Sequence, residues 1–79
     1  MLEMRPNCEC CDCDLPIDAA NAMMCTFECT FCRECAQSTL KHICPNCGGN
    51  LVERPARPEK YWNTHQASTT RVVKQGGCV

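Results

Sequence analysis

Cysteine is the residue type that offers this sequence most of its chemistry. The 79 residues include eleven cysteines, of which ten fall into four clusters between positions 8 and 47, while Cys78 stands alone. Thiolates at short, regular spacing bind metal ions, form disulfides or act as nucleophiles. The clusters could therefore serve any of these three uses, and their spacing and context distinguish between them.

Two observations favour metal binding over disulfides. Residues 1–7 contain no apolar stretch that would serve as a secretory signal, and they already carry Glu3. No segment approaches the run of about 18 apolar residues that a membrane span needs. We therefore expect a cytoplasmic protein without a membrane partner, in a reducing compartment where clustered cysteines bind metals. The odd number of cysteines also argues against a disulfide framework.

The spacing of the cysteines is typical of tetrahedral zinc sites, which need four sulfurs at about 2.3 Å from the metal. A Cys-x-x-Cys turn presents two sulfurs from adjacent backbone. Pairs with this spacing include Cys8/Cys11, Cys32/Cys35 and Cys44/Cys47, and Cys25/Cys29 forms a looser pair. Pro45 fixes φ within the last pair, and Gly48 permits the left-handed conformation in which such turns end. The four pairs together predict bound zinc, Zn2+, at two ions per chain.

The first cluster leaves two alternatives open, because Cys8/Cys11 and Cys10/Cys13 both have the Cys-x-x-Cys spacing. If Cys8/Cys11 is the ligand pair, we expect Cys10 and Cys13 to be partly buried, inert thiols. Cys78 lies far from every pair in the sequence, and we expect it to be a mobile surface thiol.

The elements that must position these cysteines are short. Residues 22–28 suit one strand of a hairpin that ends near Phe31, and residues 33–41, which lack Gly and Pro, suit two turns of helix. Residues 50–53 suit a further short strand. Phe27 and Phe31 are expected to fill the core. Ordering the backbone on folding costs about 1–2 kcal/mol per residue, and the few large apolar side chains of this chain cannot offset that cost. We therefore expect a small metal-stabilised α+β fold.

Composition divides the chain after Arg54. We expect a two-zinc module over residues 6–54 and a flexible or partly docked basic tail over residues 55–79. Residues 1–54 carry eight acidic and four basic side chains, whereas the tail carries one acidic and four basic ones. Each zinc bound by four thiolates would add a charge of about −2. The module is therefore expected to be strongly acidic.

The order of the pairs resembles a RING-type cross-brace of the treble-clef group. The residues that carry the resemblance are Cys29-Thr30-Phe31-Cys32-Arg33-Glu34-Cys35 and Cys44-Pro45-Asn46-Cys47, with Cys29 where a RING usually has histidine. The resemblance covers about residues 8–47. It implies two interleaved sites, the first made of Cys8, Cys11, Cys32 and Cys35 and the second of Cys25, Cys29, Cys44 and Cys47. It also favours Cys8/Cys11 over Cys10/Cys13. The whole sequence is similar to a family of short cysteine-rich bacterial proteins that has no assigned function.

The function that we expect is that of a protein-interaction module with two structural zinc sites. Closed sites made only of cysteine leave no open position on the metal, so we do not expect an enzyme. The partner is expected to be another protein or a second copy of this chain. Tyr61-Trp62 is expected to dock on the module or on that second copy, because exposed aromatic pairs are uncommon without a use.

Three alternative functions follow from the same residues. A nucleic-acid-binding or regulatory zinc protein is disfavoured, because the module is acidic and the cations of the tail are scattered. A RING-type ubiquitin-ligase-like adaptor is disfavoured as well. RINGs of that kind resemble one another in an apolar residue within the first cysteine pair and a basic residue just past the last pair. In this sequence Glu9-Cys10 and Gly48 stand at those places. A metal buffer or redox sensor would use Cys10, Cys13 and Cys78.

Overall fold

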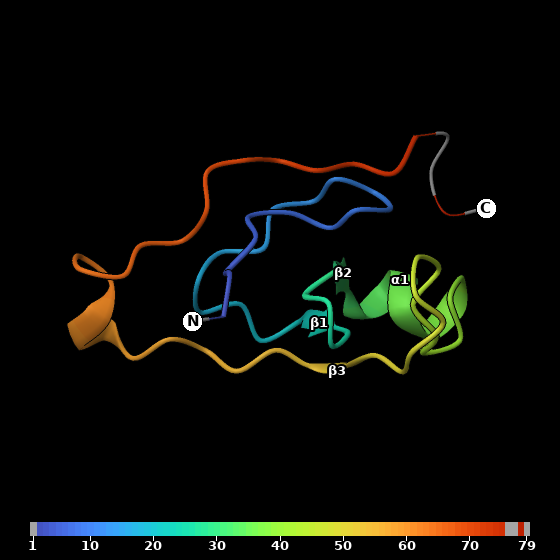
Figure 1. The fold of residues 1–79 in the computed structure, drawn as a ribbon, viewed down its shortest axis with the longest axis horizontal. Coiled ribbons are helices and arrows are strands. Elements are labelled where there is room, and N and C mark those ends of the chain that lie inside the picture. The colour runs from blue at the N-terminus through green and yellow to red at the C-terminus, as the bar shows by residue number, and fades with distance from the viewer. Residues whose placement is uncertain (1, 76–77, 79) are drawn as a thin grey trace.

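The computed structural model describes residues 2–75 and Cys78. This part of the chain forms a small α+β structure, elongated with dimensions of 37 × 20 × 19 Å (Figure 1). Its elements are β1 (Ala22–Met24), β2 (Thr30–Cys32), α1 (Arg33–Ser38), β3 (Val52–Glu53) and the 3-10 helix η1 (Glu59–Tyr61). None of the helices in the described residues is long and apolar enough to cross a membrane.

The sheet has three antiparallel strands in the order β2-β1-β3. Met23 at the centre of β1 pairs with Phe31 of β2 on one side and with Glu53 of β3 on the other. The hairpin between β1 and β2 confirms the one predicted from the sequence. Its connection is closed by the amide of Cys25, which donates to the carbonyl of Cys29 at 3.2 Å. The hairpin thus brings the members of this cysteine pair together.

Helix α1 follows β2 directly and is shorter than the sequence predicts. Cys32 caps its N-terminus, because the Cys32 Sγ accepts the backbone amide of Cys35 at 3.4 Å. The helix ends at Ser38 rather than near position 41. Lys41 and His42 have φ values of 53° and 63°, a left-handed conformation that no helix can continue through. A sequence without Gly or Pro gives no warning of this ending.

The core is small, and cysteines make up a large share of it. The buried cluster contains Cys8, Leu15, Ala22, Met23, Cys25, Cys29, Phe31, Cys32, Ala36, Leu40, Cys44 and Leu51. Phe31 is fully buried, as expected, but the expectation for Phe27 was wrong because 71% of its surface is exposed. Phe27 lies in the turn after Cys25, where the amide of Phe27 donates to the Cys25 Sγ at 3.3 Å. That contact holds the backbone of the turn and leaves the ring in solvent.

A buried arginine joins the N-terminal loop to the end of β3. Arg54 is only 5% exposed, and its guanidinium donates to the carbonyls of Arg5 at 2.7 Å and Pro16 at 2.8 Å. It also donates to the carbonyl of Leu15 at 3.3 Å. A buried guanidinium needs such partners, because unpaired donors would lose their hydration without compensation. Arg54 thus fixes the loop that carries the first cysteine cluster.

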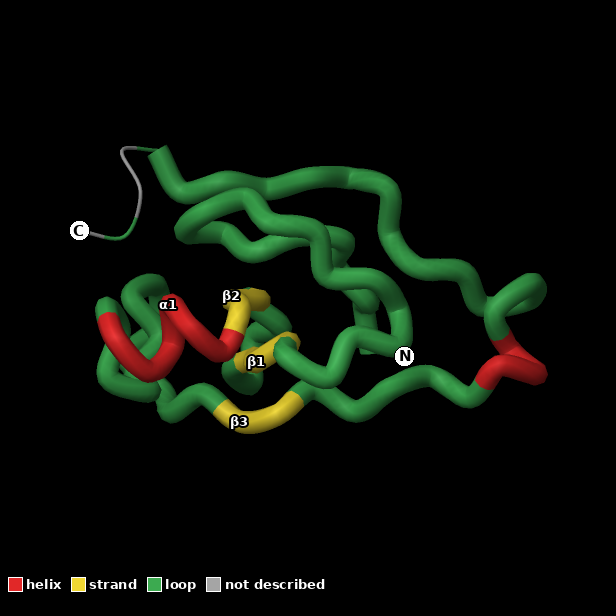
Figure 2. Tube along the Cα trace, turned by 180° about the vertical axis from the view of Figure 1, so that it is seen from behind, coloured by secondary structure: helices red, strands yellow, loops and turns green. Residues whose placement is uncertain are grey.

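The segment after β3 leads away from the sheet, turns at η1 and returns along the N-terminal loop (Figures 1 and 2). Hydrogen bonds along its length hold the returning segment. The amide of Ser68 donates to the Met4 carbonyl at 3.0 Å, and the amide of Lys74 donates to the Glu9 carbonyl at 2.7 Å. Between them the side chain of Asn7 donates to the Val72 carbonyl at 3.0 Å. Residues 68–74 therefore lie against the loop of the first cluster.

The two phenylalanines give a matched test of this core. Phe31→Ala should lower the free energy of unfolding by about 3–5 kcal/mol, because it empties a fully buried site. Phe27→Ala should change it by no more than about 0.5 kcal/mol, because the ring lies in solvent. Urea unfolding at a constant zinc concentration measures both, and equal effects of the two substitutions would contradict the packing described here.

Candidate metal centre

Two loops that hold predicted ligands have the same backbone conformation. In residues 8–13 and again in residues 44–49, the amide of the first cysteine donates to the carbonyl five positions later, at 2.9 Å and 2.7 Å. In both loops the amide four positions later donates back to that cysteine's carbonyl at 2.9 Å. The donor residues are Asp12 and Gly48, with φ of 62° and 78°. The left-handed turn predicted at Gly48 is confirmed, and Asp12 forms an equivalent turn after Cys11.

Each of the four predicted pairs contains a sulfur that accepts a backbone amide. The bonds run from Cys10 N to Cys8 Sγ at 3.3 Å, Phe27 N to Cys25 Sγ at 3.3 Å, Cys35 N to Cys32 Sγ at 3.4 Å and Gly49 N to Cys47 Sγ at 3.4 Å. An amide that points at a sulfur stabilises the thiolate over the thiol. The loops are thus arranged to hold negatively charged sulfurs, the form that binds a metal ion.

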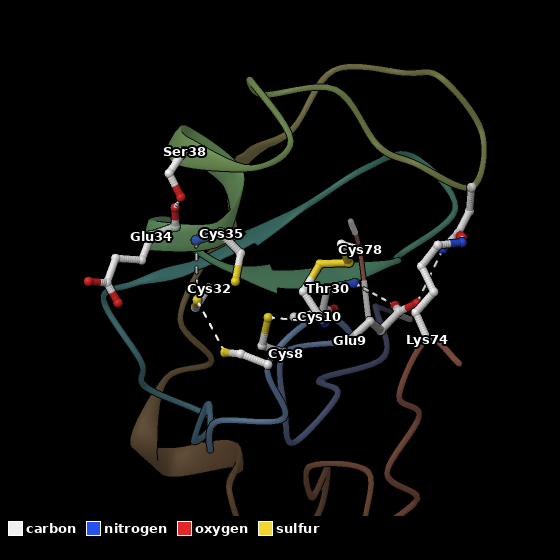
Figure 3. The surroundings of a disulfide bond; sticks show 12 residues. Cys8, Glu9, Cys10, Thr30, Cys32, Glu34, Cys35, Ser38, Lys74 and Cys78 are labelled. Carbon is white, nitrogen blue, oxygen red and sulfur yellow. Dashed lines mark hydrogen bonds between the residues drawn. A yellow bond between two sulfur atoms is a disulfide. The ribbon is translucent and has the colours of Figure 1, made fainter. Parts of the chain in front are cut away.

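The first cluster gathers four sulfurs from two distant segments. The Sγ atoms of Cys8, Cys11, Cys13 and Cys32 all lie within 4.8 Å of one another. The Cys11 and Cys32 sulfurs are 3.8 Å apart, which equals the edge of about 3.8 Å for a tetrahedron with zinc–sulfur bonds of about 2.3 Å. Cys35 lies beside this group, within 4.8 Å of Cys8 and Cys10 (Figure 3). The cluster could hold a metal ion.

The second cluster gathers three buried sulfurs. The Sγ atoms of Cys25, Cys29 and Cys44 lie within 4.8 Å of one another, and all three residues are buried. Cys47 is exposed and stays outside this group, although its thiol interacts with that of Cys44. Three convergent thiols with a fourth beside them could hold a second metal ion.

The two clusters alternate along the chain, in the order first, second, first, second. The structure brings together three predicted members of each site, namely Cys8, Cys11 and Cys32 in the first and Cys25, Cys29 and Cys44 in the second. Cys35 and Cys47 lie next to their predicted sites, and Cys13, predicted to be a spare thiol, lies within the first cluster. The ligand sets themselves stay predictions.

Protonation differs strongly among these thiols. Burial works against the thiolate of Cys11, but the amide of Cys13 and the neighbouring thiols outweigh it and lower the pKa of Cys11 to about 7. Burial, followed by the thiol of Cys11, raises the pKa of Cys13 to about 12. Burial also raises the pKa of Cys44 to about 12. A metal ion bound by Cys44 must therefore displace its proton at neutral pH.

A buried carboxylate connects the two clusters. Glu9 is 4% exposed and accepts from the Thr30 amide at 2.9 Å, from Arg5 at 3.1 Å and from the Asn46 side chain at 3.2 Å. Glu9 belongs to the first cysteine loop and Asn46 to the last one. Sequence reasoning missed this role, since a glutamate between two cysteines looks like a solvent-exposed loop residue. The only feature of the sequence that points to this role is the position of Glu9 inside the first cysteine loop.

The expectations for Cys10 and Cys78 were wrong. The structure joins them in a disulfide, with Cα atoms 5.1 Å apart and 68 positions between them in the sequence (Figure 3). The pairing follows from the return of the chain along the N-terminal loop, where Lys74 bonds to the Glu9 carbonyl. Nothing in the local sequence around Cys78 announces a contact over such a separation.

Comparisons with known proteins agree with one of the resemblances noted above. Residues 1–57 match the family described as "Protein of unknown function (DUF1272)". An uncharacterized protein of Rhizobium meliloti (strain 1021) is 60% identical over 78 residues, which cover 99% of this chain and 93% of that protein. No solved structure matches. A RING-like family is not among these matches.

The role of Glu9 can be tested by an isosteric change. Glu9→Gln should lower the free energy of unfolding by about 1–3 kcal/mol, because the new amide group faces donors that the carboxylate accepted from. Glu34→Gln is the control, since Glu34 is exposed and its side chain has no hydrogen-bond partner among the described residues. Thermal and urea unfolding measure both. A loss no larger than that of the control would refute the bridging role of Glu9.

Metal affinity should rise with pH. Cys44, with a pKa raised to about 12, carries a proton at neutral pH when no metal is bound, and an ion in the second site must displace it. Competition with a chromophoric chelator should therefore give a zinc affinity that increases from about pH 6 to about pH 8. An affinity that stays flat over this range would contradict thiol ligation.

Proposed function

The chain belongs to the DUF1272 family of proteins of unknown function, and we propose that it is a zinc-binding protein whose two metal sites build its fold. The alternation of the two cysteine clusters along the chain is the observation that carries the proposal. Each cluster draws its sulfurs from two segments, so a metal in either one would close a long loop of chain. Such loop closures contribute most where the apolar core is small.

Zinc is the metal that this donor set fits best. Thiolate donors select zinc, copper(I) or iron–sulfur clusters, and a tetrahedral arrangement of four sulfurs is typical of structural zinc. The sulfur separation of 3.8 Å in the first cluster supports a mononuclear tetrahedral ion. We assign Cys8, Cys11, Cys32 and Cys35 to the first site and Cys25, Cys29, Cys44 and Cys47 to the second. The matching loops at 8–13 and 44–49 support Cys8/Cys11 over Cys10/Cys13 as the first pair.

The interleaved order supports a RING-like cross-brace of treble-clef type within this family. Both sites are made of cysteine only, so the proposed role of the metal is structural and not catalytic. Glu9, which contacts a residue of the last cysteine loop, would hold the two sites at a fixed separation.

We further propose that the folded surface contacts another protein. An apolar groove of about 450 Å3 lies between the first residues and the segment after β3, lined by Leu2, Met4, Pro55, Ala56, Arg57, Pro58, Tyr61 and His65. Tyr61 is exposed there, whereas the indole of Trp62 donates to the Arg57 carbonyl at 2.7 Å. An apolar segment of a partner chain is the occupant that this lining favours.

Nucleic-acid binding gains no support from the basic tail. Arg71 pairs with Asp12 at 2.9 Å and with Asp14 at 2.8 Å, and the Lys74 ammonium donates to Asn46 at 3.2 Å. Arg71 is therefore partly neutralised by the chain's own acidic loop, whereas the partner of Lys74 is a neutral amide. A phosphate backbone would have to compete with those carboxylates.

Native mass spectrometry tests the proposal. The purified chain should carry two zinc ions, and removal of zinc by a chelator should abolish the folded structure over residues 8–54 in a cooperative transition. Circular dichroism and amide hydrogen exchange follow that transition. A metal-free chain with several disulfides and an unchanged fold would overturn the proposal.

A further inference from the structure

We propose that the first cluster is an exchangeable zinc site, in which Cys13 and Cys35 alternate as the fourth ligand. The inference rests on the proposed function, since it concerns the ligands of one of the two zinc ions. It adds to that function a difference in metal retention between the two sites. The first site would accept and release its metal, whereas the second would retain it.

The first cluster holds more free thiols than a tetrahedral ion can use. Three cysteines belong both to the group of four converging sulfurs and to the predicted ligand set of the first site: Cys8, Cys11 and Cys32. Cys13 completes the gathered group, in which all four sulfurs lie within 4.8 Å of one another. Cys35 also lies within 4.8 Å of Cys8, in a second group that it forms with Cys8 and Cys10. Cys13 and Cys35 are both free thiols, so two candidates compete for one coordination position.

The geometry of the two candidates is complementary. Cys13 ends the first cysteine loop, where its carbonyl accepts the amide of Cys8 at 2.9 Å. Cys35 lies in the first turn of α1, where its amide donates to the Cys32 Sγ. Each backbone is therefore held by a bond to one of the shared ligands.

A cleft leads from solvent to these sulfurs. It has a volume of about 440 Å3, and Cys11, Cys13 and Cys32 form part of its wall. The rest of the wall is polar and is made of Asp14, Asn21, Arg33, Glu34 and Gln37. Cys11 is exposed and Cys13 is half-buried. A small chelator or an acceptor thiolate can therefore reach this site without prior opening of the fold.

The second cluster differs in burial and in the number of free thiols near it. Its gathered sulfurs, those of Cys25, Cys29 and Cys44, are all buried. Cys47 is exposed, but among the described residues no fifth free cysteine lies within 4.8 Å of this group to take its place. Loss of any of these ligands would leave a coordination position without a replacement.

The exchange step is a ligand substitution without redox chemistry. As the zinc–sulfur bond to Cys13 breaks, a bond to the Cys35 sulfur forms. The Cys35 thiol gives its proton to water, and the released Cys13 thiolate takes one up. The zinc remains Zn2+ with four thiolates throughout. An acceptor thiolate that enters through the cleft would take the same position and begin the transfer of the ion.

The test counts zinc in a set of cysteine variants. All of them carry Cys10→Ser and Cys78→Ser, so that neither half of the disulfide can enter the first site, and this parent should hold two zinc ions by native mass spectrometry. Cys13→Ser and Cys35→Ser, added singly, should each retain two ions. The combination of both should retain at most one. Cys44→Ser is the matched control, which should lose one ion as a single substitution.

A rate measurement tests the exchange itself. The parent is mixed with isotopically enriched zinc, and mass spectrometry should show one ion replaced rapidly and the other slowly. In the Cys13→Ser and Cys35→Ser variants the rapid phase should slow, because the second thiolate that would displace the departing ligand is then missing. Alkylation after partial zinc removal should label the cysteines of the first cluster first.

The outcomes separate the inference from the proposed function. A parent with no zinc overturns the proposed function and the inference with it. If the parent holds two ions and either single substitution removes one of them, the ligand set of the first site is fixed. That result leaves the proposed function in place and overturns the inference. A parent with only one ion, in which Cys10 is a ligand, also overturns the inference. So does a parent with two ions that exchange at equal rates.

Discussion

The convergence of cysteine side chains from distant segments is the constraint on which this structure depends. The strands have two or three residues and the helix has six, so none of these elements would be stable alone. The buried cluster contains a single aromatic ring, that of Phe31, and five of its twelve members are cysteines. Apolar burial of this extent offsets little of the chain entropy. Each of β1, β2 and α1 contains or directly adjoins a cysteine of one of the two clusters: Cys25 follows β1, and Cys32 ends β2 and caps α1.

Polar contacts then fix how the cysteine loops face one another. Glu9 spans from the first loop to β2 and to the last loop, and Arg54 ties the N-terminal carbonyls to the end of β3. Both side chains are charged and almost fully buried, and both have several partners. Such groups discriminate between arrangements, because a shift of either loop would leave a buried charge without its hydrogen bonds. The cysteines thus bring the segments together, and these two residues determine their register.

Much of the fold was predictable from local sequence, and the rest depended on contacts between distant residues. The hairpin, the turn at Gly48 and the burial of Phe31 follow from patterns among residues that are close together in the sequence. The end of α1 at Ser38 depends on left-handed residues at 41 and 42, whose types do not require it. The exposure of Phe27, the role of Glu9 and the position of Cys13 depend on where other loops lie. Of the predicted ligands, three in each cluster converge, because spacing determines which sulfurs share a turn but not the rotamer of each one.

The disulfide between Cys10 and Cys78 has a consequence for how the chain can be divided. It links the first cysteine loop to Cys78, so that residues 10–78 form one covalent ring. A single peptide-bond cleavage anywhere between these two residues would produce two fragments that remain attached to each other. The segment from 55 to 75 would then be released only after a second cut or after reduction. In its oxidised form the protein is protected from losing that segment by its connectivity, independently of how tightly the segment is packed.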